Sequence, residues 1–200
     1  MLLYHQPRSR STRVLWLVEE AGAPVDVTLL TREHKQTDEY RKLHPLANSP
    51  VLVDADGPVF ESAALVLHLA DLHPEAGLIA PPGSHERALQ YQWAFFGMVE
   101  LEGPLIDVAR QLWKDSGEPL AEIMDAALAR FRRAAAVVEA TLAGADHLVG
   151  DGFSVADIIV GSVLSFARTA EITELPPGLL AYVDGLEARP ARVRASTRTA

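Results

Sequence analysis

The chain has 200 residues, 48% hydrophobic and 22% charged, which is enough for one ordinary domain or two small ones and excludes wholesale disorder. The formal net charge of −9 disfavours broad attraction to nucleic acid, and the absence of cysteine excludes disulfides, thiolate metal sites and catalysis by a protein thiol. No apolar run approaches the roughly 18 residues of a membrane span, and the N-terminus lacks a secretory pattern, so we expect a cytoplasmic protein without a membrane partner.

Strand and helix signals alternate over residues 1–75. One helix is expected where residues 9–13 open the apolar run that begins at Val14 and that Gly22 closes with a C-terminal signal. Another is expected over residues 62–72, with a helical turn at 38–43 between them. Short apolar or alternating runs predict strands at residues 1–5, 25–30, 51–54 and 59–60, the last two joined as a hairpin by residues 54–57. The predicted order is βαβαββα.

Strand signals vanish after a Pro- and Gly-containing linker at residues 76–84. Gly97, Gly103 and Pro104 are expected to bend a long helical stretch at 86–114. Three further helices are predicted at 120–142, 155–167 and 179–188; the second is apolar on nearly every face and should be central, and the tail from Arg189 should be frayed. We therefore predict an α/β domain over 1–75, a linker over 76–84 and an all-helical domain over 85–200.

Two hydroxyls lie where the first strand passes into the first helix. Ser9 or Ser11 is explained structurally as the helix N-cap. The same place suits a bound anion, because free N–H groups and the positive end of the helix dipole face it. A hydroxyl there can also donate to a bound thiolate and lower its pKa. Both interpretations stay open from the residues alone.

Ser49 and Pro50 precede the third strand. An ordinary strand start explains them; a cis bond, found in about 5–6% of X–Pro pairs, would instead leave the backbone of Ser49 available to an extended peptide. Glu61 and Ser62 end the fourth strand and open the next helix. Ser62 is explained as an N-cap, although a helix N-terminus beside a carboxylate also suits an α-amino acid group.

Ser154 and Asp157 have the spacing of a capping box before an apolar run, with Phe153 as the preceding hydrophobic residue. We interpret this motif as a folding element. Most of the aromatic side chains over residues 93–113 are expected in the core, with some lining an apolar pocket. No His pair has the HExxH spacing, and no metal site is predicted.

Together these motifs resemble the cytosolic glutathione transferase superfamily, in a serine-type subgroup known from bacteria and fungi. The resemblance rests on Pro-x-Ser-Arg-Ser-x-Arg at 7–13, His-Pro-Leu-x-x-Ser-Pro at 44–50, Glu-Ser at 61–62 and Phe-Ser-x-Ala-Asp-Ile at 153–158. It implies a thioredoxin-like N-terminal domain that binds glutathione and an all-helical C-terminal domain that binds a small-molecule electrophile. It also implies a homodimer.

The resemblance assigns roles to individual residues. Ser9 would stabilise the glutathione thiolate, with Ser11 as the alternative, and Arg10 and Arg13 would flank the sulfur. The remaining assignments concern the rest of the tripeptide: Ser49 before a cis Pro50 for the cysteinyl backbone, Glu61 and Ser62 for the γ-glutamyl ammonium and carboxylate, and Arg41 or Lys42 with Asn48 for the glycyl end.

Three positions depart from relatives in that superfamily. Tyr4 lies close to the place where tyrosine-type members keep their tyrosine, and His5 stands where another serine-type class keeps its hydroxyl. Ser49 replaces the usual valine before the proline. The leading expectation is conjugation of glutathione to hydrophobic electrophiles, with peroxide reduction equally open. The alternatives are a non-catalytic binding or scaffold member, or a glutathione-dependent disulfide reductase.

Overall fold

The computed structural model describes residues 1–198, and its contacts group them into two compact units. The first unit comprises Met1–Ile79 together with the described residues from Glu187 onward, and the second comprises Ala80–Leu186. This grouping differs from the predicted division, which assigned the C-terminal residues to the helical domain. The last two residues of that predicted domain lie outside the described residues.

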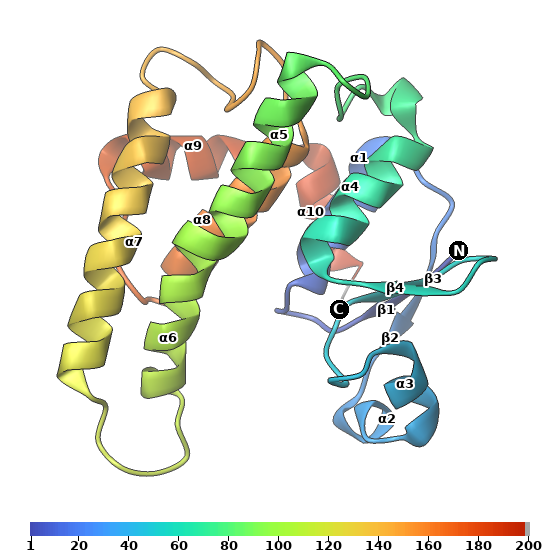
Figure 1. Ribbon diagram of the computed structural model, residues 1–200, viewed down its shortest axis with the longest axis horizontal. Helices are drawn as coiled ribbons and strands as arrows, with labels where there is room; N and C mark the ends of the chain where they lie inside the picture. The colour runs from blue at the N-terminus through green and yellow to red at the C-terminus, as the bar shows by residue number, and fades with distance from the viewer. Residues whose placement is uncertain (199–200) are drawn as a thin grey trace. The chain divides into compact units, whose positions relative to one another are not determined.

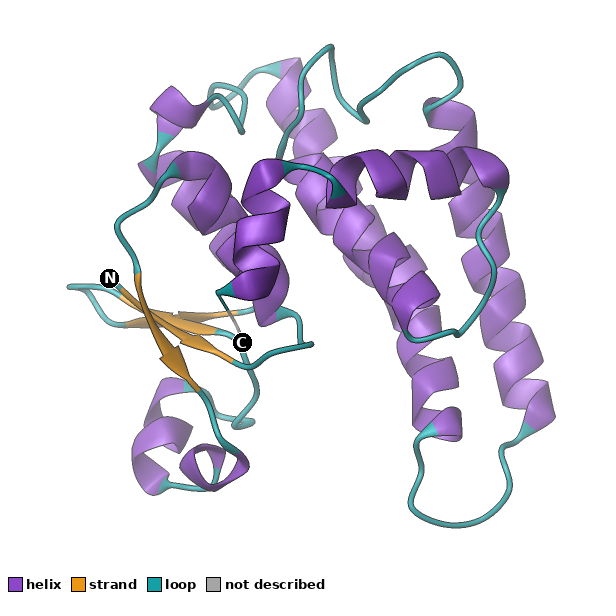
Figure 2. Cartoon of the chain, turned by 180° about the vertical axis from the view of Figure 1, so that it is seen from behind, coloured by secondary structure: helices purple, strands orange, loops and turns teal. Residues whose placement is uncertain are grey.

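A four-stranded mixed sheet forms the centre of the first unit (Figures 1 and 2). Strand β1 pairs in parallel with β2 and antiparallel with β3, which pairs antiparallel with β4. Helices α1 and α4 cover one face, and the short α2 and α3 lie on the other (Figure 1). The bounds are β1 Leu2–His5, α1 Ser11–Ala21, β2 Asp26–Leu29, α2 Arg32–Lys35, α3 Asp38–Leu43, β3 Val51–Val53, β4 Pro58–Phe60, α4 Ser62–Leu72 and the 3₁₀ turn Pro74–Ala76.

The predicted thioredoxin-like order is confirmed, with α2 as an element that the sequence pattern missed. Side chains of a strand alternate between its two faces, so Leu3 and His5 are buried on one side of β1. Tyr4 lies on the other side and makes edge contacts with the rings of His34 and Tyr40. Burial raises the pKa of Tyr40 to about 12, and the neighbouring Tyr4 adds to the shift.

The C-terminal helix α10 (Pro190–Thr197) packs against α1, so the predicted fraying from Arg189 is wrong. Two ion-pair sets explain why the segment is ordered. Arg189 binds Glu20 with Nε–Oε1 and Nη2–Oε2 distances of 2.6 and 3.0 Å. Arg194 and Arg198 bind Glu19; although burial opposes the shift, their hydrogen bonds hold the pKa of Glu19 below its ordinary value.

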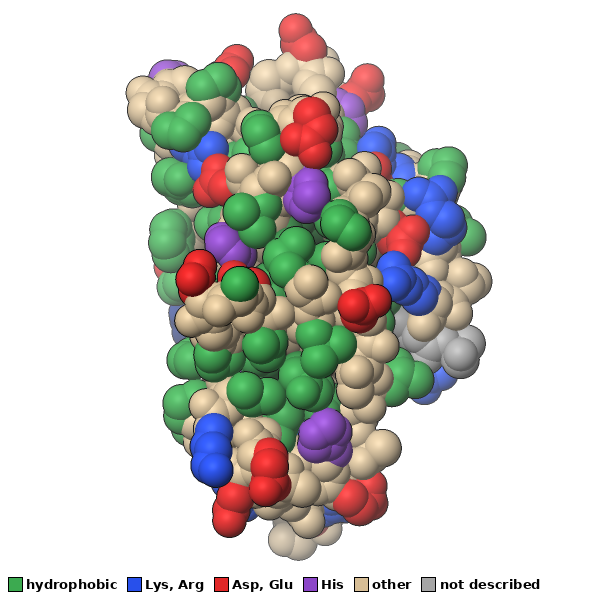
Figure 3. Space-filling model, turned by 90° about the vertical axis from the view of Figure 1, so that its right-hand side faces the viewer, with side chains coloured by type: hydrophobic (Ala, Val, Ile, Leu, Met, Phe, Trp, Pro, Cys, Tyr) green, Lys and Arg blue, Asp and Glu red, His purple; other side chains and the backbone are tan. Residues whose placement is uncertain are grey.

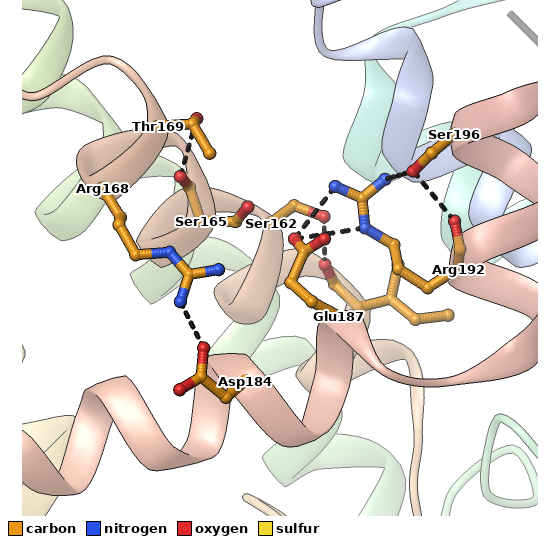
Figure 4. A network of polar contacts seen from close by, with 9 residues as sticks. Ser162, Ser165, Arg168, Thr169, Asp184, Glu187, Arg192 and Ser196 are labelled. Atoms are coloured by element: carbon orange, nitrogen blue, oxygen red, sulfur yellow. Dashed lines mark hydrogen bonds and ion pairs between the residues drawn. The ribbon is translucent and has the colours of Figure 1, made fainter.

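Arg192 adds a third tie within the same segment. Its guanidinium binds the Glu187 carboxylate and donates to Ser196 Oγ (Figure 4). The same guanidinium lies over the ring of Trp16, 5.5 Å from the centroid. Arginines spaced along α10 thus anchor it to α1 and to the preceding turn, a pattern that a residue-by-residue propensity does not show.

The second unit is all-helical, as predicted. Gly97 and Gly103 bound a π-helical segment that interrupts the first long helical stretch. An added Cβ at Gly97 would lie 3.2 Å from Val160 Cγ2 of α8, so the close approach of the two helices favours glycine there. The helices are α5 His85–Phe96, the π segment Gly97–Glu102, α6 Gly103–Leu112, α7 Ala121–Thr141, α8 Val155–Thr169 and α9 Pro177–Glu187.

Helix α8 lies at the centre of the second unit's core, which confirms the prediction of a buried helix. Its start is the predicted capping box: Ser154 Oγ accepts from Ala156 N–H, and the Asp157 carboxylate accepts from Ser154 N–H at 2.9 Å. Asp157 also accepts from Leu148 N–H and from the Tyr182 hydroxyl, at 3.0 and 2.7 Å. The Ser154 hydroxyl and both carboxylate oxygens of Asp157 therefore have protein partners.

The aromatic side chains of α5 and α6 divide between core and surface. Trp93 is buried, whereas Phe95 and Trp113 are 68% and 61% exposed. Trp113 still makes an edge contact with the ring of Phe166. Across residues 1–198, no helix combines the length and apolar composition that crossing a bilayer requires.

Candidate functional site

The corner between β1 and α1 brings the two predicted hydroxyls together. Ser9 is half-buried, and its hydroxyl donates to the Gln6 carbonyl at 2.7 Å. Ser11 is fully buried, and its Oγ lies 2.8 Å from Ser9 Oγ. Ser11 Oγ also accepts from Gln6 N–H at 3.0 Å and lies 2.7 Å from His5 Nδ1. The half-buried hydroxyl is thus the outer member of a short polar chain.

The two serines differ in how they meet the start of α1. Arg10 occupies the N-cap position, and within residues 1–198 its side chain makes no capping hydrogen bond. Ser11 is the first helical residue, and Ser9 Oγ accepts from Ser11 N–H at 3.2 Å. The N-cap interpretation is therefore wrong for Ser11, whereas the Ser9 hydroxyl does accept from a backbone N–H at the helix start, as a capping side chain does. The two hydroxyls also bind each other and the preceding turn. The first N–H groups of a helix lack intrahelical partners, so this corner keeps a partial positive charge beside Ser9.

The two arginines predicted beside the sulfur differ in environment. Arg10 is exposed next to Ser9. Arg13 is buried, and its Nη1 donates to Ser62 Oγ at 3.4 Å. Arg13 therefore links the start of α1 to the start of α4. Its guanidinium places a buried positive charge beneath Ser62, where an anion at the start of α4 would be stabilised.

The start of α4 has an unusual backbone. Glu61 is the N-cap residue with φ 75° and ψ 112°, and its side chain is exposed. A non-glycine residue in this sparsely populated region costs about 1–3 kcal/mol, and such outliers cluster at ligand sites. Ser62 is the first residue of the helix and not its N-cap, so the N-cap explanation of Ser62 is also wrong.

The segment before β3 carries three predicted residues. The Ser49–Pro50 peptide bond is cis. Ser49 Oγ is buried, and among the described residues it has no hydrogen-bond partner. Asn48 is exposed, and its carbonyl accepts from the Tyr40 hydroxyl at 2.7 Å. This bond fixes the loop to α3 just before the chain enters the sheet.

A basic hollow of about 340 Å³ lies in the first unit, and Gln6 of the turn between β1 and α1 is part of its lining. Of the two predicted cations Arg41 and Lys42, Arg41 lines the hollow, and within the described chain Lys42 is not among the residues that do. Lys35 Nζ donates to Gln6 Oε1 at 3.2 Å. The full lining is Gln6, Arg32, Lys35, Gln36, Arg41 and Ala47.

Sequence reasoning missed two of these cations, Arg32 and Lys35. They stand three positions apart directly after the second strand, on the short helix α2 that the pattern did not predict. A pair of cations one helical turn apart behind a strand end was the available signal. The hollow suits an anionic group, because three cations face it and no carboxylate lines it among residues 1–198.

Tyr4 does not join the hydroxyls. Its side chain lies on the face of β1 opposite to that of His5, where it contacts His34 and Tyr40. For residues 1–198, no group of three or more His, Asp and Glu side chains is arranged to hold a metal ion. The chemistry that the corner itself offers is hydrogen-bond donation and positive charge toward an anion.

Each of the two units contains a region that matches a model of a known protein family. A family model described as "Glutathione S-transferase, N-terminal domain" matches residues 1–71, and one described as "Glutathione S-transferase, C-terminal domain" matches residues 121–185. Glutathione S-transferase 3 of Zea mays is 30% identical over 94% of this chain and 90% of its own length. Elongation factor 1-gamma of Prunus avium is 34% identical over 67% of this chain, which covers only 31% of that relative.

Solved structures are similar over the whole chain. The ternary complex of BphK, a bacterial glutathione transferase, has a TM-score of 0.88 at 27% identity and covers 100% of this chain and 99% of its own. A sphingomonad glutathione S-transferase complexed with glutathione has a TM-score of 0.84 at 25% identity, with 100% and 98% coverage.

Proposed function

The chain belongs to the glutathione S-transferase superfamily, and from this premise we propose that it binds glutathione in its first unit and uses the bound thiolate as a nucleophile toward hydrophobic electrophiles. The observation that carries the proposal is the half-buried hydroxyl of Ser9 at the start of α1, held 2.8 Å from the buried Ser11. A family relative is solved with glutathione bound.

The proposed role of Ser9 is to donate its hydroxyl hydrogen to the sulfur. A hydrogen bond to the anionic form favours that form and lowers the thiol pKa. The start of α1 and the exposed guanidinium of Arg10 add positive potential in the same direction. The thiolate is the reactive nucleophile, so a larger thiolate fraction near neutral pH raises the rate of attack.

The remaining tripeptide groups have matching partners. We propose that Glu61 binds the γ-glutamyl ammonium, and that the start of α4 with Ser62 binds the adjacent carboxylate above buried Arg13. The strained backbone of Glu61 supports this assignment. The backbone of Ser49 before Pro50 would pair with the cysteinyl part.

The glycyl carboxylate is proposed to bind at the basic hollow. Arg41 and Lys35 are its proposed partners there, with Asn48 near that end. Lys42 is the weaker candidate because it does not line the hollow among the described residues. Side chains of the second unit are proposed to select the electrophile.

A homodimer is proposed on the family's precedent. Apolar side chains gather on the face shown in Figure 3. Within the first unit, Leu46 is 75% exposed, and Phe60 and Leu72 are also exposed. Single exposed apolar residues are ordinary, but contiguous ones favour an interaction surface.

A second candidate function is a non-catalytic binding module. The observation that favours it is the match to elongation factor 1-gamma, a protein named for another role that shares this region. In that case glutathione would bind weakly or would not be turned over.

Isothermal titration calorimetry with glutathione tests the proposal. We expect saturable binding below millimolar concentration. Glu61→Gln should raise the Kd about tenfold, because the amide keeps the shape but loses the charge-assisted bond to the ammonium. Glu75→Gln, an exposed carboxylate on the 3₁₀ turn, is the matched control and should leave the Kd unchanged.

No heat of binding at millimolar glutathione would overturn the enzymatic proposal. Binding without turnover of halogenated aromatics, enones, hydroperoxides or disulfides would favour the non-catalytic module. Turnover restricted to hydroperoxides or disulfides would replace conjugation by the corresponding reductive reaction.

A further inference from the structure

We propose that His5 is a positioning residue: by donating its Nδ1–H to Ser11, it keeps Ser11 from accepting the Ser9 hydrogen, so that Ser9 can donate a hydrogen bond to the bound thiolate. This inference rests on the proposed function. It concerns the order of hydrogen bonds behind Ser9, in which His5 touches neither glutathione nor the electrophile.

The geometry of the chain is continuous. His5 is fully buried at the end of β1, and its Nδ1 lies 2.7 Å from Ser11 Oγ. Ser11 Oγ lies 2.8 Å from Ser9 Oγ. The other ring nitrogen, Nε2, is buried without a hydrogen-bond partner among residues 1–198. The imidazole is therefore attached to the site through Nδ1.

Proton counting shows what each ring tautomer would do. Ser11 Oγ has two lone pairs and one hydrogen. It already accepts from Gln6 N–H at 3.0 Å. If His5 donates through Nδ1–H, both lone pairs are used, and Ser9 cannot donate to Ser11. The Ser11 hydrogen must then go to the Gln6 carbonyl at 2.9 Å or to Ser9 Oγ.

This arrangement releases Ser9. In the structure Ser9 donates to the Gln6 carbonyl at 2.7 Å. When a thiolate is bound, the Ser9 hydrogen can turn to the sulfur, because Ser11 still supplies the Gln6 carbonyl. A hydrogen bond to an anion is about twice as strong as one to a neutral acceptor, which favours the exchange.

The opposite tautomer would hold Ser9 back. With the proton on Nε2, His5 accepts the only hydrogen of Ser11 through Nδ1. The Gln6 carbonyl then depends on Ser9 alone, and turning Ser9 to the sulfur would leave that carbonyl without either hydroxyl. Leaving this part-buried acceptor without its protein donors opposes the exchange.

Two observations favour the proton on Nδ1. Burial lowers the pKa of His5 to about 4, so the ring is neutral near pH 7 and carries one proton. A proton on Nε2 would be a buried N–H without a partner, a rare and unfavourable arrangement. On Nδ1 the proton has an acceptor at 2.7 Å.

The first test is the tautomer itself. Long-range ¹H–¹⁵N correlation spectra of the protein with ¹⁵N-labelled histidine distinguish Nδ1–H from Nε2–H. The His5 signal is assigned by its loss in His5→Asn, and His85→Asn, at an exposed helix start, is the matched control. We expect Nδ1–H. An Nε2–H ring would overturn the proposal whether or not the protein binds glutathione.

The second test follows the bound thiol. Its pKa is measured by the ultraviolet absorbance of the thiolate in the complex with glutathione, together with the pH profile of kcat/KM. His5→Leu should raise that pKa by about one unit, which is about tenfold less thiolate below it. The KM for glutathione should stay within about twofold. His5→Asn, whose amide nitrogen donates near the place of Nδ1, should restore most of the effect.

The outcomes separate this role from the proposed function. If His5→Leu leaves the pKa of the bound thiol unchanged, the positioning role alone is overturned. Absence of glutathione binding by the unmodified protein would overturn the proposed function and this role with it. Should His5→Leu fail to fold, the tautomer spectrum and the His5→Asn titration still decide.

Discussion

Helices α1 and α8 both begin at serine hydroxyls, yet the two starts use them differently. At α8, Ser154 and Asp157 bond the first backbone N–H groups, and Asp157 is fully buried with further bonds to Leu148 and Tyr182. At α1, Ser9 Oγ likewise accepts from a helix-start N–H, but Ser9 and Ser11 also bond each other and the preceding turn, and Ser9 is half-buried.

The difference shows that a hydroxyl at a helix start is not itself a functional signal. Its role depends on whether the hydroxyl can leave its protein partners for a ligand without leaving one of them unsatisfied. Ser154 cannot turn to a ligand without uncovering a buried carboxylate. Ser9 can, because Ser11 reaches the same Gln6 carbonyl. Variants at the two corners should therefore separate stability from catalysis.

The largest effect is expected for Asp157→Ala. It would leave the Leu148 N–H and the Tyr182 hydroxyl without their acceptor inside the second unit's core. We expect the free energy of unfolding to fall by about 3–4 kcal/mol, measured by urea denaturation.

The control for that variant is Asp184→Ala. Asp184 binds Arg168 on the surface (Figure 4) and is 70% exposed, so the loss should stay below about 1 kcal/mol. Equal losses for Asp157→Ala and Asp184→Ala would contradict the view that the α8 corner is a closed structural unit.

The next effect concerns pH and the α1 corner. The His5 pKa is about 4 in the folded protein against an ordinary 6.5. The unfolded chain therefore binds more protons between these values, and the stability that His5 contributes above pH 6.5 is lost as pH falls toward 4. The loss amounts to roughly 2–3 kcal/mol.

His5→Asn removes that titration. Unfolding curves at several pH values should show a smaller decline below pH 6.5 for the variant than for the unmodified protein. The buried His44, whose pKa burial also lowers, stays in both proteins, so its contribution to the pH dependence cancels in the difference. Parallel declines would indicate that His5 is protonated in the folded state.

Ser9→Ala is expected to change the free energy of unfolding less than the variants above, and to act mainly on the catalytic rate. Loss of the donor should lower kcat about tenfold and raise the pKa seen in kcat/KM, with the KM for glutathione within about twofold. Ser11→Ala serves as the comparison. It should lower the free energy of unfolding as well as kcat, because Ser11 is fully buried and its oxygen accepts a hydrogen bond from Gln6 N–H. An unchanged pH profile for Ser9→Ala would pass the activating role to Ser11, since Tyr4 lies on the opposite face of β1.

The sequence predicted the start of α8 more fully than the start of α1. Ser154 and Asp157 lie within one helical turn, so their spacing alone specifies the capping box. The serines at the α1 corner were found, but their relation to His5 depends on the register of β1 and on the turn between, which local patterns do not encode. The same limit hid the contact of Arg13 with Ser62, 49 positions apart.

Two further misses have the same physical origin. Lys35 lies on α2, a helix of four residues, too short to show a periodic pattern. Helix α10 was missed because its arginines gain their order from Glu19 and Glu20, about 170 positions earlier. By contrast, the succession of strands and helices along residues 1–75 and the buried α8 follow from hydrophobic patterning, and these predictions were confirmed.

The smallest effect compares the same substitution at both corners. Ser154→Ala removes the hydroxyl that accepts from Ala156 N–H at 3.3 Å and should lower the free energy of unfolding by about 1 kcal/mol. Ser9→Ala also removes an acceptor, that of Ser11 N–H at 3.2 Å, but the Ser9 hydroxyl is only half-buried and its carbonyl acceptor keeps Ser11, so the loss should be smaller, about 0.5 kcal/mol. Urea denaturation of both variants measures the difference. A Ser9→Ala loss as large as that of Ser154→Ala would mean that the Ser9 hydroxyl stabilises the fold, and a hydroxyl committed to the fold is not available to a thiolate.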